Sequence, residues 1–247
     1  MQDGMFPKTY REKEENSEAV KVQFLKESLK LILDKKKCAG CNVCVRACPK
    51  EAFTKYTPEG PKELFGKKII YKKAYYYIPF IHDIDKCVFC GLCTYLCPFD
   101  ALRLEVNGEI VPPEEIQLVQ SNAVPKLESE KVTLENGNEA KVYVEGTISI
   151  DTTKCNTGCT NCGDICPTGA IKITPDLSSR DEDWGQQVKF EIYANDCIHC
   201  GACHSICPTE ALQLEITEVK HSGEYNSPFW DDVENRLKLG KRETKQN

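Results

Sequence analysis

The sequence has no apolar run long enough to cross a membrane. Its first residues, Met1 to Glu15, are polar and charged, with neither the apolar core of a signal peptide nor a twin-arginine pair. Disulfide bonds persist only in oxidising compartments, and a chain without a secretion signal is expected to stay where thiols are reduced. We therefore expect a cytoplasmic protein without a membrane span, whose cysteines are free of disulfide bonds.

The sequence also lacks the motifs that bind nucleotides. It contains neither the G-x-G-x-x-G turn of dinucleotide sites nor a phosphate-binding P-loop. Only four histidines occur, and no Ser/His/Asp or Cys/His constellation is left once the cysteines have another role. These absences argue against a catalytic site, so we expect a protein that is not itself an enzyme.

Cysteine, in contrast, is abundant: it accounts for 16 of the 247 residues. Three groups have the spacing Cys-x2-Cys-x2-Cys-x3-Cys-Pro, which is the cluster-binding pattern of bacterial ferredoxins, and a fourth group has one extra residue in its first gap. These four tetrads use every cysteine of the chain. They are Cys38, Cys41, Cys44 and Cys48; Cys87, Cys90, Cys93 and Cys97; Cys155, Cys159, Cys162 and Cys166; and Cys197, Cys200, Cys203 and Cys207.

Other roles for cysteine explain this pattern less well. Zinc sites are usually built from separate Cys-x2-Cys pairs, whereas these tetrads are dense and each ends in Cys-Pro. A disulfide scaffold would need an oxidising compartment. An iron-sulfur cubane has four irons that each take one thiolate, which matches four tetrads of cysteine. The sequence therefore predicts four 4Fe-4S clusters.

The Cys-Pro cysteine of such a tetrad ligates the neighbouring cluster, because three close cysteines can reach only three corners of one cubane. This rule predicts four ligand sets, which we name sites 1 to 4. Site 1 is Cys38, Cys41 and Cys44 with Cys97; site 2 is Cys87, Cys90 and Cys93 with Cys48; site 3 is Cys155, Cys159 and Cys162 with Cys207; and site 4 is Cys197, Cys200 and Cys203 with Cys166.

Two further features bear on these sites. Apolar residues beside the ligands are predicted to exclude water and help set the reduction potentials; they are Val43, Val45, Phe89, Leu92, Leu96, Ile165, Ile198 and Ile206. The extra residue between Cys155 and Cys159 lengthens the loop of site 3. We expect a small bulge that retains a 4Fe-4S cluster there, with loss or alteration of the cluster as the alternative.

Each tetrad is followed by an alanine and, in three cases, by alternating apolar residues that predict a half-buried strand. The repeating unit is therefore strand, cluster loop, short helix, strand. Glycine precedes the second cysteine in the first and third tetrads and follows it in the second and fourth, which suggests the duplication of a two-tetrad unit. We predict an α+β fold with two tandem ferredoxin-like domains of two clusters each, at residues 34–107 and 140–220.

The flanking segments have other compositions. Residues 1–33 are predicted to be a polar tail up to residue 16 and then, from apolar steps of three and four, an amphipathic helix over Ser17 to Leu33. Residues 108–139 form an acidic linker, with a hairpin around Asn136-Gly137. Residues 221–247 are a tail with a short helix that begins near Pro228.

A long insertion lies between Pro49 and Lys86. It carries a basic stripe, for which we weigh a solvated hairpin against a docking site for an acidic redox partner. The lysines of this stripe are Lys62, Lys67, Lys68, Lys72 and Lys73.

The tetrads and their flanks resemble the polyferredoxins, multi-cluster relatives of the 8Fe ferredoxins that serve as subunits of anaerobic redox complexes. Within that family, the run from Ile84 to Leu102 and the tail from Glu224 to Trp230 look most like the polyferredoxin subunit of archaeal formylmethanofuran dehydrogenase. The resemblance implies a chain that carries low-potential electrons to a tungsten or molybdenum unit that reduces carbon dioxide in methanogenesis. Its four clusters are fewer than is usual there, and the widened third tetrad is a second departure.

The charge of the chain bears on its partners. Each cubane with its thiolates adds about −2 to the formal charge of −6, which reaches about −14 with four clusters. Nucleic acids bind to clustered positive charge and are therefore not expected as partners. We expect electron transfer with catalytic oxidoreductase subunits and a donor of the ferredoxin, hydrogenase or heterodisulfide-reductase type. An iron-sulfur redox sensor, or a polyferredoxin of a hydrogenase or heterodisulfide-reductase complex, is the alternative.

Overall fold

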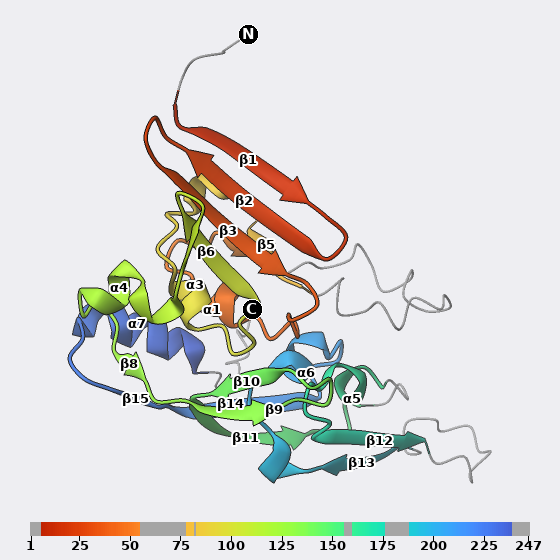
Figure 1. The fold of residues 1–247 in the computed structure, drawn as a ribbon. Helices are drawn as coiled ribbons and strands as arrows, with labels where there is room; N and C mark the ends of the chain where they lie inside the picture. The colour runs from red at the N-terminus through yellow and green to blue at the C-terminus, as the bar shows by residue number, and fades with distance from the viewer. Residues whose placement is uncertain (1–5, 55–77, 82, 156–159, 176–187, 239–247) are drawn as a thin grey trace, which may run out of the picture.

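The computed structural model describes residues 6–54, 78–81, 83–155, 160–175 and 188–238. The lysines of the predicted basic stripe lie outside these residues. The described chain forms two groups of short elements, one above the other in Figure 1. We call the segment from Ser28 to Val106 the first unit and the segment from Val144 to Val219 the second unit.

The first unit contains the first two tetrads. Its elements are β3 (Ser28–Asp34), α1 (Val43–Ala47), β4 (Phe53–Thr54), β5 (Phe80–Ile81), η3 (Ile84–Lys86), α3 (Leu92–Tyr95) and β6 (Leu102–Val106). The second unit contains the other two tetrads. Its elements are β11 (Val144–Ile150), α5 (Asn161–Ile165), β12 (Ile171–Pro175), β13 (Val188–Ile192), η6 (Ala194–Asp196), α6 (Ala202–Ile206) and β14 (Leu212–Val219).

The strands of the two units pair in the same way. The strand before the first tetrad pairs antiparallel with the strand after the second, as β3 with β6 and β11 with β14. The two inner strands also pair, as β4 with β5 and β12 with β13. Each unit therefore closes on itself, and the predicted α+β arrangement with tandem ferredoxin-like units is confirmed.

The predicted amphipathic helix over Ser17 to Leu33 is wrong. The segment forms strand β2 (Ser17–Gln23) and strand β3, joined by a tight turn in which the Phe24 amide donates to the Glu27 carbonyl over 2.7 Å. Its apolar residues also alternate at period two, so that Leu31 and Leu33 of β3 are buried. Pairing with β6 makes the strand the more stable choice, since it joins the segment to an existing sheet.

The predicted polar tail is also wrong where the structure describes it. Strand β1 (Lys8–Lys13) pairs antiparallel with β2 along its whole length. Together with β7 (Glu109–Val111), these strands make a five-stranded sheet in the order β1-β2-β3-β6-β7, which projects at the top of Figure 1. Residues on both sides of the first unit thus extend its outer strand pair.

The segment between the units is a series of short elements. They are η4 (Pro113–Glu115), α4 (Gln117–Gln120), β8 (Lys126–Leu127), β9 (Glu130–Thr133) and β10 (Glu139–Val142). Strands β9 and β10 pair antiparallel, and Gly137 has a φ of 80° in the turn between them. The hairpin predicted around Asn136-Gly137 is therefore present.

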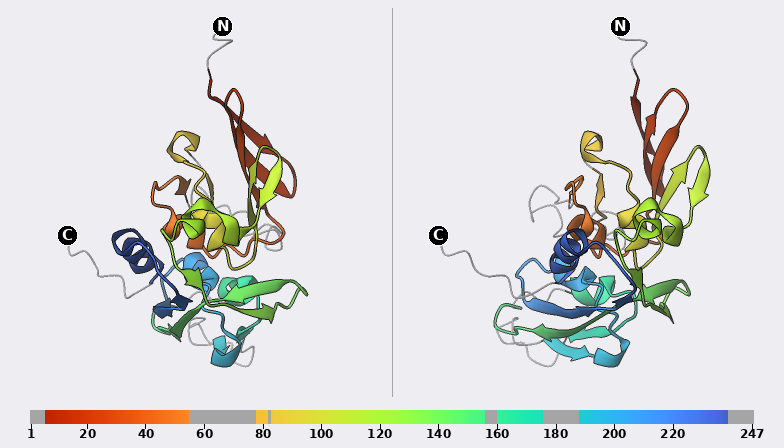
Figure 2. Two further views of the ribbon diagram at one scale, coloured as in Figure 1. Left: turned by 60° about the vertical axis from the view of Figure 1, so that its left-hand side comes forward. Right: turned by 90° about the vertical axis from the view of Figure 1, so that its left-hand side faces the viewer.

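The C-terminal segment contributes a strand and a helix. Strand β15 (His221–Ser222) pairs with β8, and helix α7 (Ser227–Leu237) follows. The Asn226 side chain caps α7 by accepting from the Phe229 amide, and Pro228 lies in its first turn, as the sequence predicts. The two views in Figure 2 show α7, in dark blue, beside both units.

One main hydrophobic core joins the two units. It includes Leu31 of the sheet, Val43 of the first cluster loop, Ile198 and Ala202 of the fourth, and Trp230 of α7. A second core is much smaller and belongs to the second unit; it consists of Cys162, Ile171, Cys203 and Leu212. No helix among the described residues is long and apolar enough to cross a membrane.

Candidate iron-sulfur cluster sites

The loop around the second cysteine of a tetrad has the same backbone shape in three places. A residue with positive φ lies on each side of that cysteine: Gly40 and Asn42 flank Cys41, Phe89 and Gly91 flank Cys90, and His199 and Gly201 flank Cys200. Glycine accepts this conformation without strain, whereas a side chain rarely does. The alternating place of glycine in these tetrads thus reflects one loop shape with two left-handed positions.

This shape directs backbone amides toward the cysteine sulfurs. The amide two residues after a cysteine donates to its sulfur, as Val43 does to Cys41, Phe89 to Cys87 and His199 to Cys197. Such bonds favour the thiolate, which is the form that ligates iron. The loop is therefore built for a negatively charged sulfur ligand.

The turn after each Cys-Pro pair also repeats. The residue three places after the Cys-Pro cysteine has positive φ in every tetrad: Glu51, Asp100, Gly169 and Glu210. The next residue is the alanine noted in the sequence, and it is almost fully buried each time. Its amide donates to the cysteine sulfur over 3.3 Å in three tetrads: Ala52 to Cys48, Ala101 to Cys97 and Ala211 to Cys207.

The carbonyl of the same alanine holds the turn against the other tetrad of the unit. Ala101 accepts from the Asp34 amide, four residues before Cys38, over 2.8 Å. Ala211 accepts from the Asp151 amide, four residues before Cys155, over 2.8 Å. Ala170 likewise accepts from the Tyr193 amide, four residues before Cys197, over 2.8 Å. Cys97, Cys166 and Cys207 are thus carried to the start of the partner tetrad.

The thiols of the predicted sites lie near one another. One pocket is lined by Cys48, Cys87, Cys90 and Cys93, the four cysteines predicted for site 2. Another is lined by Cys166, Cys197, Cys200 and Cys203, the four predicted for site 4. The thiols surround these pockets without converging on one point, and no three His, Cys, Asp or Glu side chains of the described residues lie close enough to hold a single metal ion.

For the other two sites, the evidence is the electrostatic effect of one thiol on the pKa of another and the packing of the cysteines in the core. Burial raises the pKa of Cys41 to about 11, and the neighbouring Cys97 adds to this effect. The charge of Cys97 also helps to raise the pKa of Cys38 and of Cys44. All four cysteines predicted for site 1 therefore lie near one another. For site 3, Cys207 packs against the small core that includes Cys162, while Cys159 lies outside the described residues.

The surroundings of these thiols fit a buried cluster. Burial is the largest cause that raises the pKa of Cys87 to about 11 and of Cys203 to about 12, so these thiols are protonated near neutral pH unless a metal binds them. Among the apolar neighbours predicted to exclude water, Leu92, Leu96 and Ile206 are buried. Thiolate donors around a dry, apolar pocket are the environment of a 4Fe-4S cluster.

Several residues near the sites have roles that the sequence alone does not predict. Arg236 of α7 donates to the Cys48 carbonyl over 2.9 Å, across 188 positions of sequence. Lys141 of β10 pairs with Asp100 over 2.8 Å, and its charge favours the thiolate of Cys97. Arg46, inside the first tetrad, has a buried guanidinium. The only signal for Arg46 was a cation at an otherwise buried helix position; the other contacts depend on tertiary structure.

Comparisons with known proteins agree with this geometry. A model of the 4Fe-4S dicluster domain matches residues 37–101 and 154–211, and a second model with the same description matches residues 79–167. The two matches of the first model correspond to two dicluster domains and therefore to four 4Fe-4S clusters.

Similar proteins include two from methanogens. An uncharacterized ferredoxin of Methanocaldococcus jannaschii is 31% identical over 80 residues, which are 31% of this chain and 88% of that protein. Polyferredoxin protein MvhB of Methanothermobacter marburgensis is 41% identical over 59 residues, 24% of this chain but only 14% of that much longer protein.

A solved structure covers nearly the whole chain. It is a chain of the formate dehydrogenase, heterodisulfide reductase and formylmethanofuran dehydrogenase complex from Methanospirillum hungatei. The TM-score is 0.72 at 22% identity, over 96% of this chain and 93% of that one, which shows a shared fold. Taken with the paired tetrads, these matches show that the chain belongs to the ferredoxins with 4Fe-4S dicluster domains, a family of electron-transfer proteins.

Proposed function

We propose that this chain is a non-catalytic electron-transfer subunit that relays low-potential single electrons between an external donor and a catalytic partner. A bound 4Fe-4S cluster supplies reversible one-electron reduction. The chain itself supplies the thiolates, the amides that donate to their sulfurs and the apolar residues that exclude water. Two sets of paired sites in one chain are more than a single-step carrier needs, which favours a relay.

The proposed ligands are those of sites 1 to 4. The observation that carries this assignment is that the carbonyls of Ala101, Ala170 and Ala211 each accept a hydrogen bond from the amide four residues before the partner tetrad. It supports exchange of the Cys-Pro cysteine between the two tetrads of a unit. The pocket lined by Cys48 and the three cysteines of another tetrad supports the same exchange for site 2.

The proximity of particular cysteines supports an order for the relay. Cys44 of site 1 lies near Cys93 of site 2, and Cys203 of site 4 lies near Cys162 of site 3. Between the units, Cys41 of site 1 lies near enough to Cys200 of site 4 that its charge adds to burial in raising the pKa of Cys200. Since electron tunnelling falls steeply with distance, we infer the order site 2, site 1, site 4, site 3.

The proposed partner is an oxidoreductase complex of the formylmethanofuran dehydrogenase type, in which a tungsten or molybdenum unit reduces carbon dioxide. Similarity in fold to a chain of a methanogen complex that contains formylmethanofuran dehydrogenase supports this proposal. The identification of the bound subunits after anaerobic purification of the tagged chain from its native source tests it. Recovery of the chain with hydrogenase subunits, and without a carbon-dioxide-reducing unit, would replace this partner by another.

The cluster content can be tested on the isolated chain. Anaerobic iron and sulfide analysis should give about sixteen irons and as many sulfides per chain, because each cubane contains four of each. Electron paramagnetic resonance (EPR) of the dithionite-reduced protein should show signals of interacting cubanes. Stoichiometric zinc with no such signal would refute the electron-transfer proposal.

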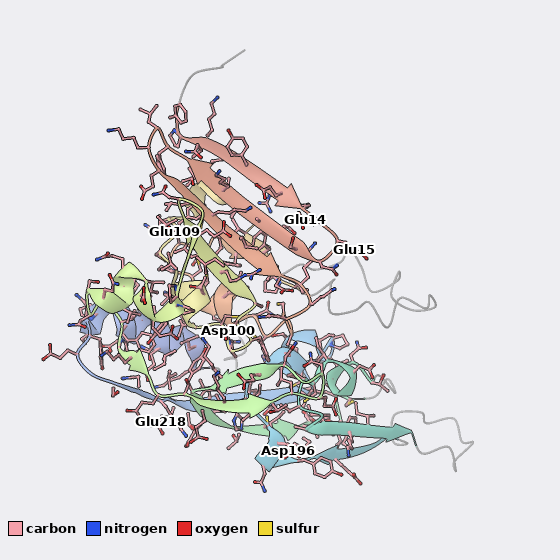
Figure 3. The ribbon with its side chains drawn as sticks, viewed as in Figure 1. Glu14, Glu15, Asp100, Glu109, Asp196 and Glu218 are labelled. Carbon is pink, nitrogen blue, oxygen red and sulfur yellow. The ribbon has the colours of Figure 1, made fainter. Side chains whose placement is uncertain are left out.

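The surface gives little support to the redox-sensor alternative, in which the chain acts on nucleic acid. Exposed carboxylates lie on both units, such as Asp100 of the first and Asp196 and Glu218 of the second, and on the flanks of the first unit, such as Glu14 and Glu109; all are labelled in Figure 3. Such a surface repels phosphates. A gel-shift assay at low salt with single- and double-stranded probes should show no complex with the holo-protein, and a salt-sensitive complex would favour the sensor.

A further inference from the structure

The boundary between the two units contains a buried cation that has no carboxylate partner in the part of the chain that the structure describes. Arg46 lies on α1, between Cys44 and Cys48. The Nε and Nη2 atoms of its guanidinium are buried and have no hydrogen-bond acceptor, while Nη1 donates to the Cys41 carbonyl at 3.5 Å, the limit of a hydrogen bond. Among the described residues, no carboxylate lies within ion-pair distance of Arg46. A cation in this position is costly unless negative charge compensates it.

The groups around Arg46 come from both units. A narrow pocket at the boundary is lined by Arg46 and Val43 of the first unit, by His199 and Cys200 of the second, and by Tyr143 and Lys141 of the segment between them; Lys141 is already paired with Asp100. Burial raises the pKa of Tyr143, so its hydroxyl stays neutral, and the neighbours that carry negative charge toward the guanidinium when ionised are the thiols of Cys41, Cys44 and Cys200. The Tyr143 hydroxyl already donates to the Leu96 carbonyl. The thiolates of sites 1 and 4 are therefore the anions left to compensate Arg46.

The repeated tetrads provide an internal comparison. The residue two places after the third cysteine is Arg46 in the first tetrad, and it is Tyr95, Asp164 and Ser205 in the others. Tyr95 donates to the Pro125 carbonyl over 2.9 Å, and Asp164 accepts from Thr160 over 2.8 Å. A cation occurs at this place in the tetrad that faces the second unit and in no other.

We propose that Arg46 is the counter-ion of the boundary between site 1 and site 4. This inference rests on the proposed function. A cubane with four thiolates is an anion, and one-electron reduction adds a further negative charge. A fixed guanidinium nearby favours the reduced form of either cluster and weakens the repulsion between two reduced neighbours. Passage of an electron across the boundary oxidises one cluster by one electron and reduces the other by one, so Arg46 compensates the charge on both sides of the step.

The test is an EPR-monitored redox titration of the holo-protein with Arg46 replaced by Gln. The reduction potentials of the two boundary clusters should shift to more negative values, because a positive charge that favours the added electron is lost. The potentials of the two outer clusters, at sites 2 and 3, should stay close to those of the unmodified protein. Variants that lose one ligand, Cys90→Ala and Cys162→Ala, assign the outer signals.

Two further variants separate charge from structure. Arg46→Lys keeps the charge and should retain reduction potentials near those of the unmodified protein. If Arg46 acted only through packing, the Lys variant would have no reason to keep these potentials. Arg103→Gln removes an exposed cation of the same unit, on β6, and should change none of the four potentials, since solvent screens surface charge. Arg46→Met is a second neutral variant, to be used if the Gln variant does not assemble.

The outcome is read only from variants with the iron content of the unmodified protein. Unchanged boundary potentials in a fully loaded Gln or Met variant would refute the role of Arg46, while the four clusters and the relay would stand. An equal shift at all four sites would also refute it. If the unmodified chain itself holds no cubanes, the proposed function fails instead, so the two failures are distinguishable.

Discussion

The two units bring equivalent cysteines into different surroundings. Cys97 of the first unit is buried in the main core, whereas Cys207 of the second unit is only half-buried and packs against the small core. The five-stranded sheet and α7 enlarge the support of the first unit, while the second unit consists mainly of two-stranded ribbons. The same cysteine pattern thus occurs once within a large core and once at its edge, where the bound clusters themselves must contribute more to stability.

The largest expected effect follows from removal of the exchanged ligand. Cys97→Ala removes the fourth ligand of site 1. It should therefore lower the iron content by about four of sixteen irons and abolish the EPR signal of the cluster bound by Cys38, Cys41 and Cys44. Cys207→Ala should cost a similar amount of iron at site 3. Only the first variant should strongly lower the melting temperature of the whole chain, since site 1 lies in the main core and site 3 packs against the small one.

Iron analysis, EPR and thermal denaturation under anaerobic conditions check this prediction. If Cys97→Ala instead removed the cluster of Cys87, Cys90 and Cys93, the exchange of ligands between tetrads would be wrong.

Next in size is the contribution of α7 to the main core. Trp230 is fully buried, so Trp230→Ala should lower the free energy of unfolding by about 3–5 kcal/mol. Its neighbour Phe229 is only partly buried, and Phe229→Ala is the matched control with a smaller expected loss. Urea denaturation of the holo-protein measures both losses when it is monitored by circular dichroism of the backbone, a signal that does not depend on the removed tryptophan. Equal effects of the two variants would show that α7 is not anchored through Trp230.

The comparison also predicts an order of iron loss. With a ferrous chelator under anaerobic conditions, site 3 should lose iron several-fold faster than site 1, because less of the protein covers it and local opening there disrupts a smaller core. EPR spectra taken during chelation, with Cys162→Ala and Cys44→Ala as reference spectra, follow the two sites separately. Simultaneous loss from both sites would mean that the two units open as one.

The smallest effect concerns the chemistry of the two exchanged thiols. Burial works against ionisation of Cys207, but hydrogen bonds from the Leu212 amide and from the hydroxyl and amide of Thr209 outweigh it and lower its pKa. Burial raises the pKa of Cys97 despite its own amide donors. A lower pKa gives more thiolate at a given pH, so Cys207 of the cluster-free chain should be alkylated at lower pH than Cys97.

Peptide mapping after iodoacetamide pulses between pH 6 and about 9 compares the two thiols around the ordinary range for cysteine. Thr209→Val should move the Cys207 profile to higher pH and leave that of Cys97 unchanged. A Cys207 profile that does not respond to Thr209→Val would show that the hydroxyl has no part in the lowered pKa.

Local pattern was enough to predict the core of each unit. The spacing of the cysteines, the alanine after each Cys-Pro pair and the alternation over Leu102 to Leu104 all act over a few residues, and the structure has the expected loops, turns and strands there. The start of α7 near Pro228 and the turn at Asn136-Gly137 are equally local. Each of these features depends on the backbone preference of the residues that form it.

The failures occurred where a partner element decided the outcome. Leu29, Ile32 and Leu33 fit a helical spacing, and Leu29, Leu31 and Leu33 fit a strand equally well; pairing with β2 and β6 selected the strand. The sequence does not predict the role of Arg46 for the same reason. Its meaning depends on Cys200, which lies more than half the chain away in sequence, and no periodicity reports such a contact.

The hydrogen bond between the Ala101 carbonyl and the Asp34 amide has a consequence for biosynthesis. A growing chain can form the first half of site 1 early, but the site stays open until Cys97 and β6 have left the ribosome. Site 3 must likewise wait for Cys207 and β14. Domains fold during synthesis from the N-terminal end, so the first unit is complete while the second is still being made. Helix α7, made after both units, then covers α1 next to Cys48, so a chain that stalls before α7 would expose the first unit's loops to oxygen.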